Sequence, residues 1–264
     1  MPHSINALIL GDLVGQAGCR ALFLALPGLI KKYSADFVVV NGENASGGFG
    51  LTPDIFEKIL SAGAHVVTSG NHIWQQKDIF PLLDSRDILL RPHNYPKGSP
   101  GHGFCVVENR GVRAAVLNLE GRERMSNLLC PFTTAKDVLK RLRQECRVIL
   151  VDFHAEDAAE KEALGLYLDG EVSVVFGTHT HVATADERIL PAGTAYITDI
   201  GMTGAEDSVI GFSPELAVRR SLTQLPLKPE PADTPACVSG IAVSIDAQNG
   251  KALSIERVSH RSLV

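Results

Sequence analysis

Short runs of apolar, mostly β-branched residues alternate with longer segments of helical periodicity in the first part of the chain. We predict buried strands at residues 7–10, 37–40 and 65–68, separated by helices at 15–32 and 52–61. Thr52 and Pro53 supply an N-cap and a first-turn proline for the second helix, and Pro27 marks a break or kink in the first. This strand–helix alternation predicts parallel pairing through right-handed crossovers.

The later part of the chain changes character. Asn109, Arg110 and Gly111 separate two apolar runs and predict a hairpin, and Asn249-Gly250 predicts a second tight turn. A helix is predicted at 134–144, capped by Thr133 or Thr134. We further predict strands at 104–107, 112–117, 148–151, 172–176, 188–190, 195–198, 238–245 and 252–258, a helix at 156–168, and an exposed proline-rich loop at 226–235. The C-terminal third is expected to be antiparallel.

Length and composition fit an ordinary globular protein. The chain has 264 residues, of which 45% are hydrophobic and 21% are charged, enough for a sizeable core. Without an internal repeat or a clear linker, residues 1–264 are predicted to form a single domain. The segment 121–131 is polar and irregular, and we predict that it forms a flap.

Charge and cysteine usage narrow the function classes. A net charge of −5 argues against an extended nucleic-acid surface, although a local metal site can still attract a small anion. Five scattered cysteines without a CxxC pair indicate reduced thiols. The N-terminal apolar run is too short for a signal peptide, and no stretch reaches the ~20 apolar residues of a membrane span. We therefore expect a cytoplasmic protein without a membrane partner.

Polar side chains that can bind a metal follow five of the predicted strands. They are Asp12 after the first, Asn41, Glu43 and Asn44 after the second, Asn71 and His72 after the third, Asp152 and His154 after 148–151, and His179 and His181 after 172–176. Ligands of open α/β sheets bind beyond the carboxyl ends of the strands. A single such residue would be an ordinary turn, cap or structural histidine, but five converging endings predict a metal site.

Glycines accompany these polar residues. Gly42, Gly70 and Gly177 would let the backbone turn sharply and approach a ligand closely, although ordinary turns also favour glycine. Gly11, Gly15 and Gly18 follow the first predicted strand at close spacing, which makes a dinucleotide-binding fold an alternative. Their GxxxGxxG spacing departs from GxGxxG, and three later histidines would then have no role.

Seven segments spanning nearly the whole chain carry a family resemblance. They are GDLVG at 11–15, NGEN at 41–44, SGNH at 69–72, RPHNYP at 91–96, VDFHAE at 151–156, GTHTH at 177–181 and ITDIGM at 197–202. The chain resembles the YmdB-like family, a branch of the calcineurin-type metallophosphoesterases. Val14 stands where the broad superfamily has histidine, and NGEN replaces its GDxxD, as is typical of this branch.

The resemblance implies an α/β fold, a calcineurin-like sandwich of two mixed β-sheets flanked by helices (α/β/β/α), with a binuclear metal site. By position, Asp12, Glu43, Asn44 and His181 resemble the ligands of one metal, and Glu43, Asn71, His154 and His179 those of the other. His72 corresponds to the proton donor. The family is associated with iron or manganese, with hydrolysis of 2′,3′-cyclic nucleotides and other phosphodiesters, and with homo-oligomers.

The chemistry of the ligand set agrees with this interpretation. Three imidazoles, two carboxylates and two amide oxygens suit Fe, Mn or Zn, and neutral asparagines leave the site electropositive for a phosphate. We expect a metal-bound hydroxide to attack phosphorus while His72 protonates the leaving oxygen. In the alternative, His72 only orients Asn71 or the substrate. A metal-dependent amidase and a regulatory nucleotide- or RNA-binding module with slow turnover also stay open.

Other residues carry weaker signals. Arg122 in the predicted flap could reach a phosphate, but an exposed surface charge explains it as well. The glycine-rich segment 201–211 could line a pocket or simply connect two elements. Trp74 is expected to pack rather than bind a base. The remaining histidines, His3, His65, His93, His102 and His260, are assigned structural or surface roles.

Overall fold

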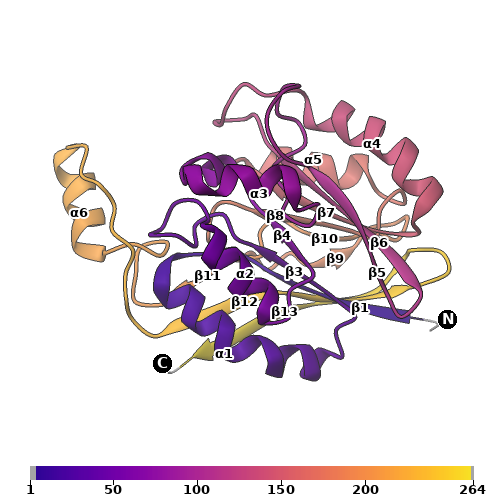
Figure 1. Ribbon diagram of the computed structural model, residues 1–264, viewed down its shortest axis with the longest axis horizontal. Helices are drawn as coiled ribbons and strands as arrows, with labels where there is room; N and C mark the ends of the chain where they lie inside the picture. The colour runs from indigo at the N-terminus through magenta and orange to yellow at the C-terminus, as the bar shows by residue number, and fades with distance from the viewer. Residues whose placement is uncertain (1–3, 263–264) are drawn as a thin grey trace.

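Two β-sheets packed face to face, each covered on its outer side by helices, make up the computed structural model (Figure 1). The structure describes residues 4–262, so His3 lies outside the described residues. The first sheet has the order β2-β11-β12-β1-β3-β4 with β13 paired to β12, and the second has the order β5-β6-β7-β8-β10-β9. The predicted α/β/β/α sandwich is therefore confirmed.

The elements have the following bounds. The first sheet contains β1 (Ser4–Leu10), β2 (Asp12–Leu13), β3 (Phe37–Asn41), β4 (Val66–Thr68), β11 (Met202–Ala205), β12 (Ala236–Asp246) and β13 (Ala252–Ser262). The second contains β5 (Phe104–Asn109), β6 (Val112–Glu120), β7 (Val148–His154), β8 (Val174–Thr178), β9 (Arg188–Ile189) and β10 (Ala195–Ile197). The helices are α1 (Gly15–Tyr33), α2 (Pro53–Ser61), α3 (Phe80–Ser85), α4 (Pro131–Glu145), α5 (Ala158–Tyr167) and α6 (Pro214–Thr223), with 3₁₀ turns η1 (Asn71–Trp74) and η2 (Lys77–Ile79).

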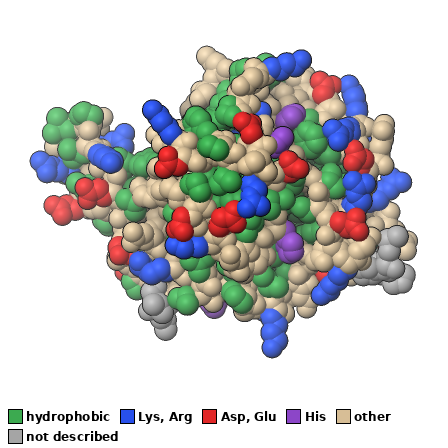
Figure 2. Space-filling view, in the orientation of Figure 1, with side chains coloured by type: hydrophobic (Ala, Val, Ile, Leu, Met, Phe, Trp, Pro, Cys, Tyr) green, Lys and Arg blue, Asp and Glu red, His purple; other side chains and the backbone are tan. Residues whose placement is uncertain are grey.

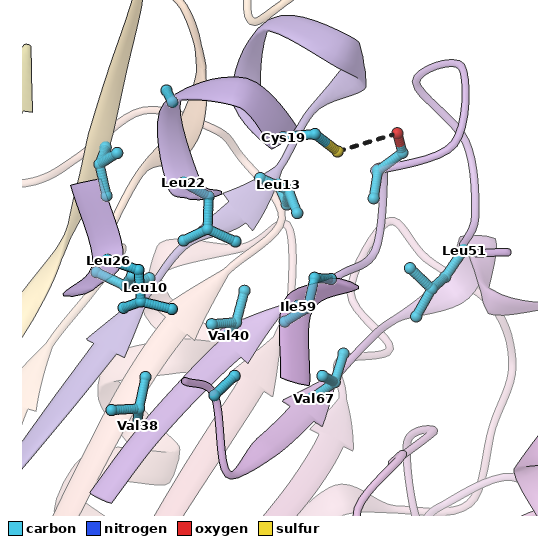
Figure 3. Packing of buried hydrophobic residues seen from close by; sticks show 14 of the residues in the cluster. Leu10, Leu13, Cys19, Leu22, Leu26, Val38, Val40, Leu51, Ile59 and Val67 are labelled. Carbon is cyan, nitrogen blue, oxygen red and sulfur yellow. Dashed lines mark hydrogen bonds between the residues drawn. The ribbon is translucent and has the colours of Figure 1, made fainter. Parts of the chain in front are cut away.

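Alternation along β1 shows how the sheets are held together. Ile5, Ala7 and Ile9 face the second sheet in the central core, whereas Leu8 and Leu10 face the helices α1 and α2. Figure 3 shows Leu10, Val38 and Val40 of the sheet packed near Leu22 and Leu26 of α1. A third cluster joins the second sheet to α4 and α5. Because both faces of each sheet are covered, the central strands read as continuous apolar runs.

Strand direction matches the predictions in part. β1, β3 and β4 are parallel, as are β6, β7 and β8. The C-terminal strands β12 and β13 form the predicted antiparallel pair. The expectation of a wholly antiparallel C-terminal third is wrong for β10, which lies parallel to β8 and extends the second sheet. The Arg110-Gly111 hairpin is confirmed, with both residues at positive φ, as a type I′ turn requires.

Several predicted boundaries need correction. Helix α4 starts at Pro131 with Cys130 at the N-cap, so Thr133 and Thr134 lie in its first turn and do not cap it. Helix α1 continues through Pro27. Thr52 is the N-cap of α2 but makes no capping hydrogen bond with its side chain. The strands β2 and β11 were not predicted, because two- to four-residue strands carry almost no periodic signal. The helices α3 and α6 were also not predicted; α3 has only six residues, and α6 buries none of its residues.

Helix α6 projects from the body of the molecule, and the proline-rich segment that follows it returns to β12 (Figure 1). None of its residues is buried, and Leu222 is 80% exposed. On the face shown in Figure 2, acidic and basic side chains are interspersed, and no continuous basic surface is visible there. Among the described residues, none of the helices combines the length and the apolar character that crossing a bilayer requires.

Candidate active site at the carboxyl ends of the strands

The predicted site residues meet where β1, β3, β4, β7 and β8 end. Strand β1 leads to Asp12 and β3 to Glu43 and Asn44, while β4 leads through Gly70 to Asn71 and His72. His154 is the last residue of β7, and His179 and His181 follow β8 directly. Parallel strands bring these endings to one edge of the structure, so residues up to 169 positions apart in the chain become neighbours.

Asp12 carries an unpaired buried oxygen at the centre of this cluster. Its Oδ2 accepts a hydrogen bond from the backbone nitrogen of His179 at 3.1 Å. Its Oδ1 is buried and finds no hydrogen-bond partner within residues 4–262. That oxygen lies 3.8 Å from Nδ1 of His154 and 3.9 Å from Nε2 of His181. A buried carboxylate oxygen without a donor is costly, and a bound cation would satisfy it.

Hydrogen bonds to the outer ring nitrogens assign the tautomers of two histidines. Nδ1 of His181 lies 2.8 Å from the carbonyl oxygen of Ile210, which can only accept, so Nδ1 carries the proton and Nε2 carries none. Nδ1 of His154 lies 2.9 Å from Oγ1 of Thr178, which donates its own hydrogen to Asp152. Nε2 of His154 therefore also carries no proton. Both imidazoles present a lone pair toward the cluster, as metal-binding histidines do.

The free Nε2 atom of His154 is surrounded by three other predicted ligands. It lies 3.0 Å from Nδ1 of His179, 3.2 Å from Oδ1 of Asn71 and 3.5 Å from Oε1 of Glu43. Nε2 of His179 faces Glu156 at 3.4 Å, which leaves Nδ1 as the inward atom. Four donors from four strand endings thus converge on a small volume.

Asn44 and His72 form a second group of contacts, which His72 joins to Glu43. Oδ1 of Asn44 is 2.7 Å from Nδ1 of His72, and Nδ2 of Asn44 is 3.0 Å from Nε2 of His181. Metal binding through Oδ1 of Asn44 would therefore need the amide to rotate. Oε1 of Glu43 is 3.1 Å from Nδ1 of His72. With two acceptors at Nδ1, His72 points its Nε2 away from Glu43.

Burial and neighbouring charges shift the pKa values in this cluster. Burial raises the pKa of Asp12 to about 6. Burial, followed by the charge of Lys161, lowers the pKa of His179 to about 4, and burial and His179 lower the pKa of His154 well below its usual value. Both imidazoles are therefore neutral at pH 7, the form that binds metals. Burial opposes protonation of His72, but the hydrogen bond and charge of Glu43 raise its pKa overall.

Gly70 permits the closest approach in the site. A Cβ atom at this position would lie 2.1 Å from Cδ2 of His154, so a larger residue would displace that ring. A Cβ at Gly177 would lie 1.8 Å from the carbonyl oxygen of Thr198. At both positions the close approach is to protein atoms, and the predicted approach to a ligand stays a prediction. At Gly11 a Cβ would meet the carbonyl oxygen of Gly201 at 1.8 Å, so protein fills the turn in which the alternative fold would bind a dinucleotide.

The donor set fits a metal ion, although it is not a finished coordination sphere. Within residues 4–262, no three His, Cys, Asp or Glu side chains converge closely enough to form one. Donors that share an ion at 2.0–2.2 Å lie about 3 Å apart, and several pairs around His154 lie 3.0–3.5 Å apart. These distances and the unpaired Oδ1 of Asp12 are the features of the donor set that fit a metal ion.

Some residues singled out in the sequence lie outside the cluster, and one inside it was missed. Asp152 belongs to β7 and accepts hydrogen bonds from Asn41, Thr68 and Thr178 in the interior. Arg122 is exposed, and its backbone nitrogen donates to Glu160. Glu120 was missed because β6 runs three residues beyond its predicted end. It is fully buried, pairs in register with His154, and burial raises its pKa to about 8.

Among the segments given weaker signals, 201–211 does reach the cluster. Its Ile210 carbonyl oxygen accepts the hydrogen bond from His181 described above, and Phe212 beyond it stacks on Phe49. Phe49 in turn contacts the ring of His72 edge-on. Trp74 packs against Phe80 and Tyr95, as expected.

Comparison with known proteins agrees with the fold. The chain is 44% identical over 254 residues to the 2′,3′-cyclic-nucleotide 2′-phosphodiesterase of Bacillus subtilis, covering 96% of each chain. A phosphatase structure from Mycoplasma pneumoniae matches with a TM-score of 0.93 and 35% identity, covering 99% of this chain and 95% of that one. A hypothetical protein from Thermus thermophilus matches with a TM-score of 0.91 and 37% identity, covering 98% of this chain and 100% of that one.

These relatives indicate the enzyme class and the family of this chain. The expectation of an enzyme that hydrolyses phosphoric esters is confirmed by the two relatives with named activities. Residues 8–258 also match the family described as YmdB-like protein. Because that match spans almost the whole chain, this protein belongs to the YmdB-like family.

Proposed function

We propose that this protein is a binuclear metal-dependent phosphodiesterase that hydrolyses 2′,3′-cyclic nucleotides or related phosphodiesters. The observation that carries the proposal is the unpaired, buried Oδ1 of Asp12, with the imidazoles of His154 and His181 beside it. The substrate class follows from the name of the Bacillus subtilis relative. A small substrate agrees with a negatively charged chain that has metal ligands at one local site.

Seven residues would hold the metal ions. Asp12, Glu43, Asn44 and His181 are proposed for one ion and Glu43, Asn71, His154 and His179 for the other, with Glu43 shared. Iron or manganese suits this mixed nitrogen and oxygen set, and zinc is chemically compatible. When bound, two divalent ions would offset the phosphate charge and lower the pKa of a coordinated water. The protein supplies the fixed directions of the lone pairs, through Ile210 at His181 and Thr178 at His154.

His72 is proposed as the proton donor. Its Nδ1 faces Oε1 of Glu43 at 3.1 Å, so its Nε2 is the atom that can transfer a proton to a leaving oxygen. The side chain is 25% exposed, which leaves it reachable for a substrate. Four expectations from the sequence stay predictions. They are a phosphate contact by Arg122, a flap at 121–131, a single domain over residues 1–264 and a homo-oligomeric state.

The test is metal analysis coupled to an activity assay. Purified protein is loaded separately with Fe²⁺, Mn²⁺ and Zn²⁺, its metal content per chain is measured, and each sample is assayed on 2′,3′-cyclic AMP, a linear diester and a monoester. We expect two ions per chain and faster hydrolysis of the cyclic diester than of the monoester. One ion per chain would favour an amidase-type site. Fully loaded protein that hydrolyses no phosphate ester would overturn the proposal.

A further inference from the structure

A fully buried ion pair lies beneath the segment that carries His179 and His181. Nζ of Lys161, on α5, is 2.7 Å from Oδ2 of Asp199, which follows β10. The two side chains are 2% and 1% exposed. Removing two charges from water costs free energy that their attraction often fails to recover, so such a pair is a weak source of stability. Its contacts indicate a different role.

The carboxylate of Asp199 connects three segments of the chain. Oδ2 accepts hydrogen bonds from Oγ1 of Thr180 at 2.8 Å and from the backbone nitrogen of Thr180 at 3.3 Å. Oδ1 accepts from the backbone nitrogen of Gly201 at 2.8 Å. Together with Lys161, one carboxylate therefore ties α5, the segment after β8 and the segment after β10 to one another.

Thr180 stands between two backbone positions that side chains rarely adopt. His179 has φ 98° and His181 has φ 66°, both in the left-handed region that favours glycine. Non-glycine residues persist there only when their surroundings hold them. The two hydrogen bonds from Thr180 to Asp199 fix the residue between them, so they set the direction in which both imidazoles leave the chain.

The packing leaves Lys161 little freedom to move. A Cβ atom at Gly177 would lie 2.8 Å from Cδ of Lys161, so the lysine stem runs directly across the backbone of β8. Helix α5 is capped at its start, where the Asp157 side chain accepts a hydrogen bond from the backbone nitrogen of Glu160 at 3.0 Å. Lys161 therefore places Asp199 at a fixed point below Thr180.

We propose that Asp199, held by Lys161, is a positioning residue that fixes the His179-Thr180-His181 segment in its metal-binding conformation and thereby sets the affinity for both ions. The proposal rests on the metal site described under the proposed function. Neither Asp199 nor Lys161 contacts the ions or the substrate in this assignment. Their positioning effect passes through the hydrogen bonds of Thr180, whereas the charge of Lys161 also acts on His179 directly, so the Thr180 variants isolate the positioning effect.

The test measures Mn²⁺ affinity by calorimetric titration of the full-length wild type and of Asp199→Asn, Lys161→Met, Thr180→Ala and Thr180→Ser. Positioning contacts behind metal ligands typically change affinity about tenfold to a hundredfold. We expect a loss of that size in Asp199→Asn and Lys161→Met, and a smaller loss in Thr180→Ala. Thr180→Ser keeps the hydroxyl and should stay within about threefold of the wild type.

Two further readouts separate the outcomes. In Thr180→Ala, turnover at saturating Mn²⁺ should return close to the wild-type value. The melting temperature of the metal-free Thr180→Ala protein should change little. A lowered melting temperature with unchanged Mn²⁺ affinity would overturn the proposal in favour of a purely structural ion pair. If Asp199→Asn and Lys161→Met fail to fold, the two Thr180 variants suffice as the test. Equal Mn²⁺ affinities of Thr180→Ala and Thr180→Ser would then overturn the proposal. Wild type that binds no Mn²⁺, Fe²⁺ or Zn²⁺ would instead refute the proposed metal site.

Discussion

Oε1 of Glu43 lies 2.6 Å from the backbone nitrogen of His72 and 3.1 Å from Nδ1 of the same residue. The other carboxylate oxygen accepts a hydrogen bond from the backbone nitrogen of Gly70. One buried side chain after β3 therefore organises the turn after β4, which carries both Asn71 and His72. This arrangement gives Glu43 a structural effect on the proposed donor in addition to its proposed contact with two ions.

Glu43→Gln should remove most of the bound metal. The substitution deletes a buried negative charge, and its amide nitrogen would face the N–H donors of Gly70 or His72. Metal content per chain, measured by elemental analysis after Mn²⁺ loading and desalting, should fall from about two toward zero. Glu123→Gln, at an exposed position, serves as the control and should retain the full content. Full occupancy in Glu43→Gln would refute the shared ligand.

His72→Gln should slow turnover while leaving the metal content unchanged. Loss of a general acid typically costs about 10²–10⁴ in kcat. Steady-state assays on a cyclic diester, run beside metal analysis, check this expectation. His102→Gln is the matched control, since His102 lies at the surface near Asp87, and its kcat should equal that of the wild type. Loss of metal with normal turnover per remaining site would mean that His72 orients a ligand and donates no proton.

Gly70→Ala should disturb the site by a steric route. The added Cβ would overlap the ring of His154, and overpacking of this kind costs about 1–3 kcal/mol of folding free energy. Denaturant titration should show that loss together with weaker Mn²⁺ binding. Gly28→Ala is the control, because Gly28 lies exposed in α1 with open space around it. That control should gain about 0.5–1 kcal/mol. Equal stabilities of the two variants would contradict the close approach.

Asp186 should contribute pH-dependent stability. Burial alone would raise its pKa, but hydrogen bonds from Thr184 and Thr198 hold the pKa below the ordinary value. A depressed folded-state pKa gives stability that is present above the unfolded-state value, about 3.9, and is lost as pH falls through the folded-state pKa. The difference in unfolding free energy between wild type and Asp186→Asn should therefore be constant from about pH 5 to 7 and shrink below about pH 4. A pH-independent difference would show that the charge contributes nothing.

The local pattern of the chain was sufficient for the core elements and for the convergence of most candidate site residues. Strands such as β1 and β3 read as short apolar runs, and helices such as α1 repeat with a period of about 3.6 residues, so neighbouring positions reveal both kinds of element on their own. Asp12, Glu43, Asn71, His154, His179 and His181 each follow or end such a strand, and parallel pairing makes those ends meet. The convergence of these residues therefore follows from sequence, even though no single distance between them does.

Only the tertiary structure decided the contacts that depend on partners far along the chain. Strand β12 inserts between β1 and β11, and β6 extends to Glu120 because β7 continues beside it. Nothing in the sequence pairs Lys161 with Asp199, yet the fold brings the two side chains together beneath Thr180. Sequence determines which residues can bind a metal, because donor chemistry is local. Folding determines which lone pairs face inward, because each is set by a hydrogen bond to a distant residue such as Ile210 or Thr178.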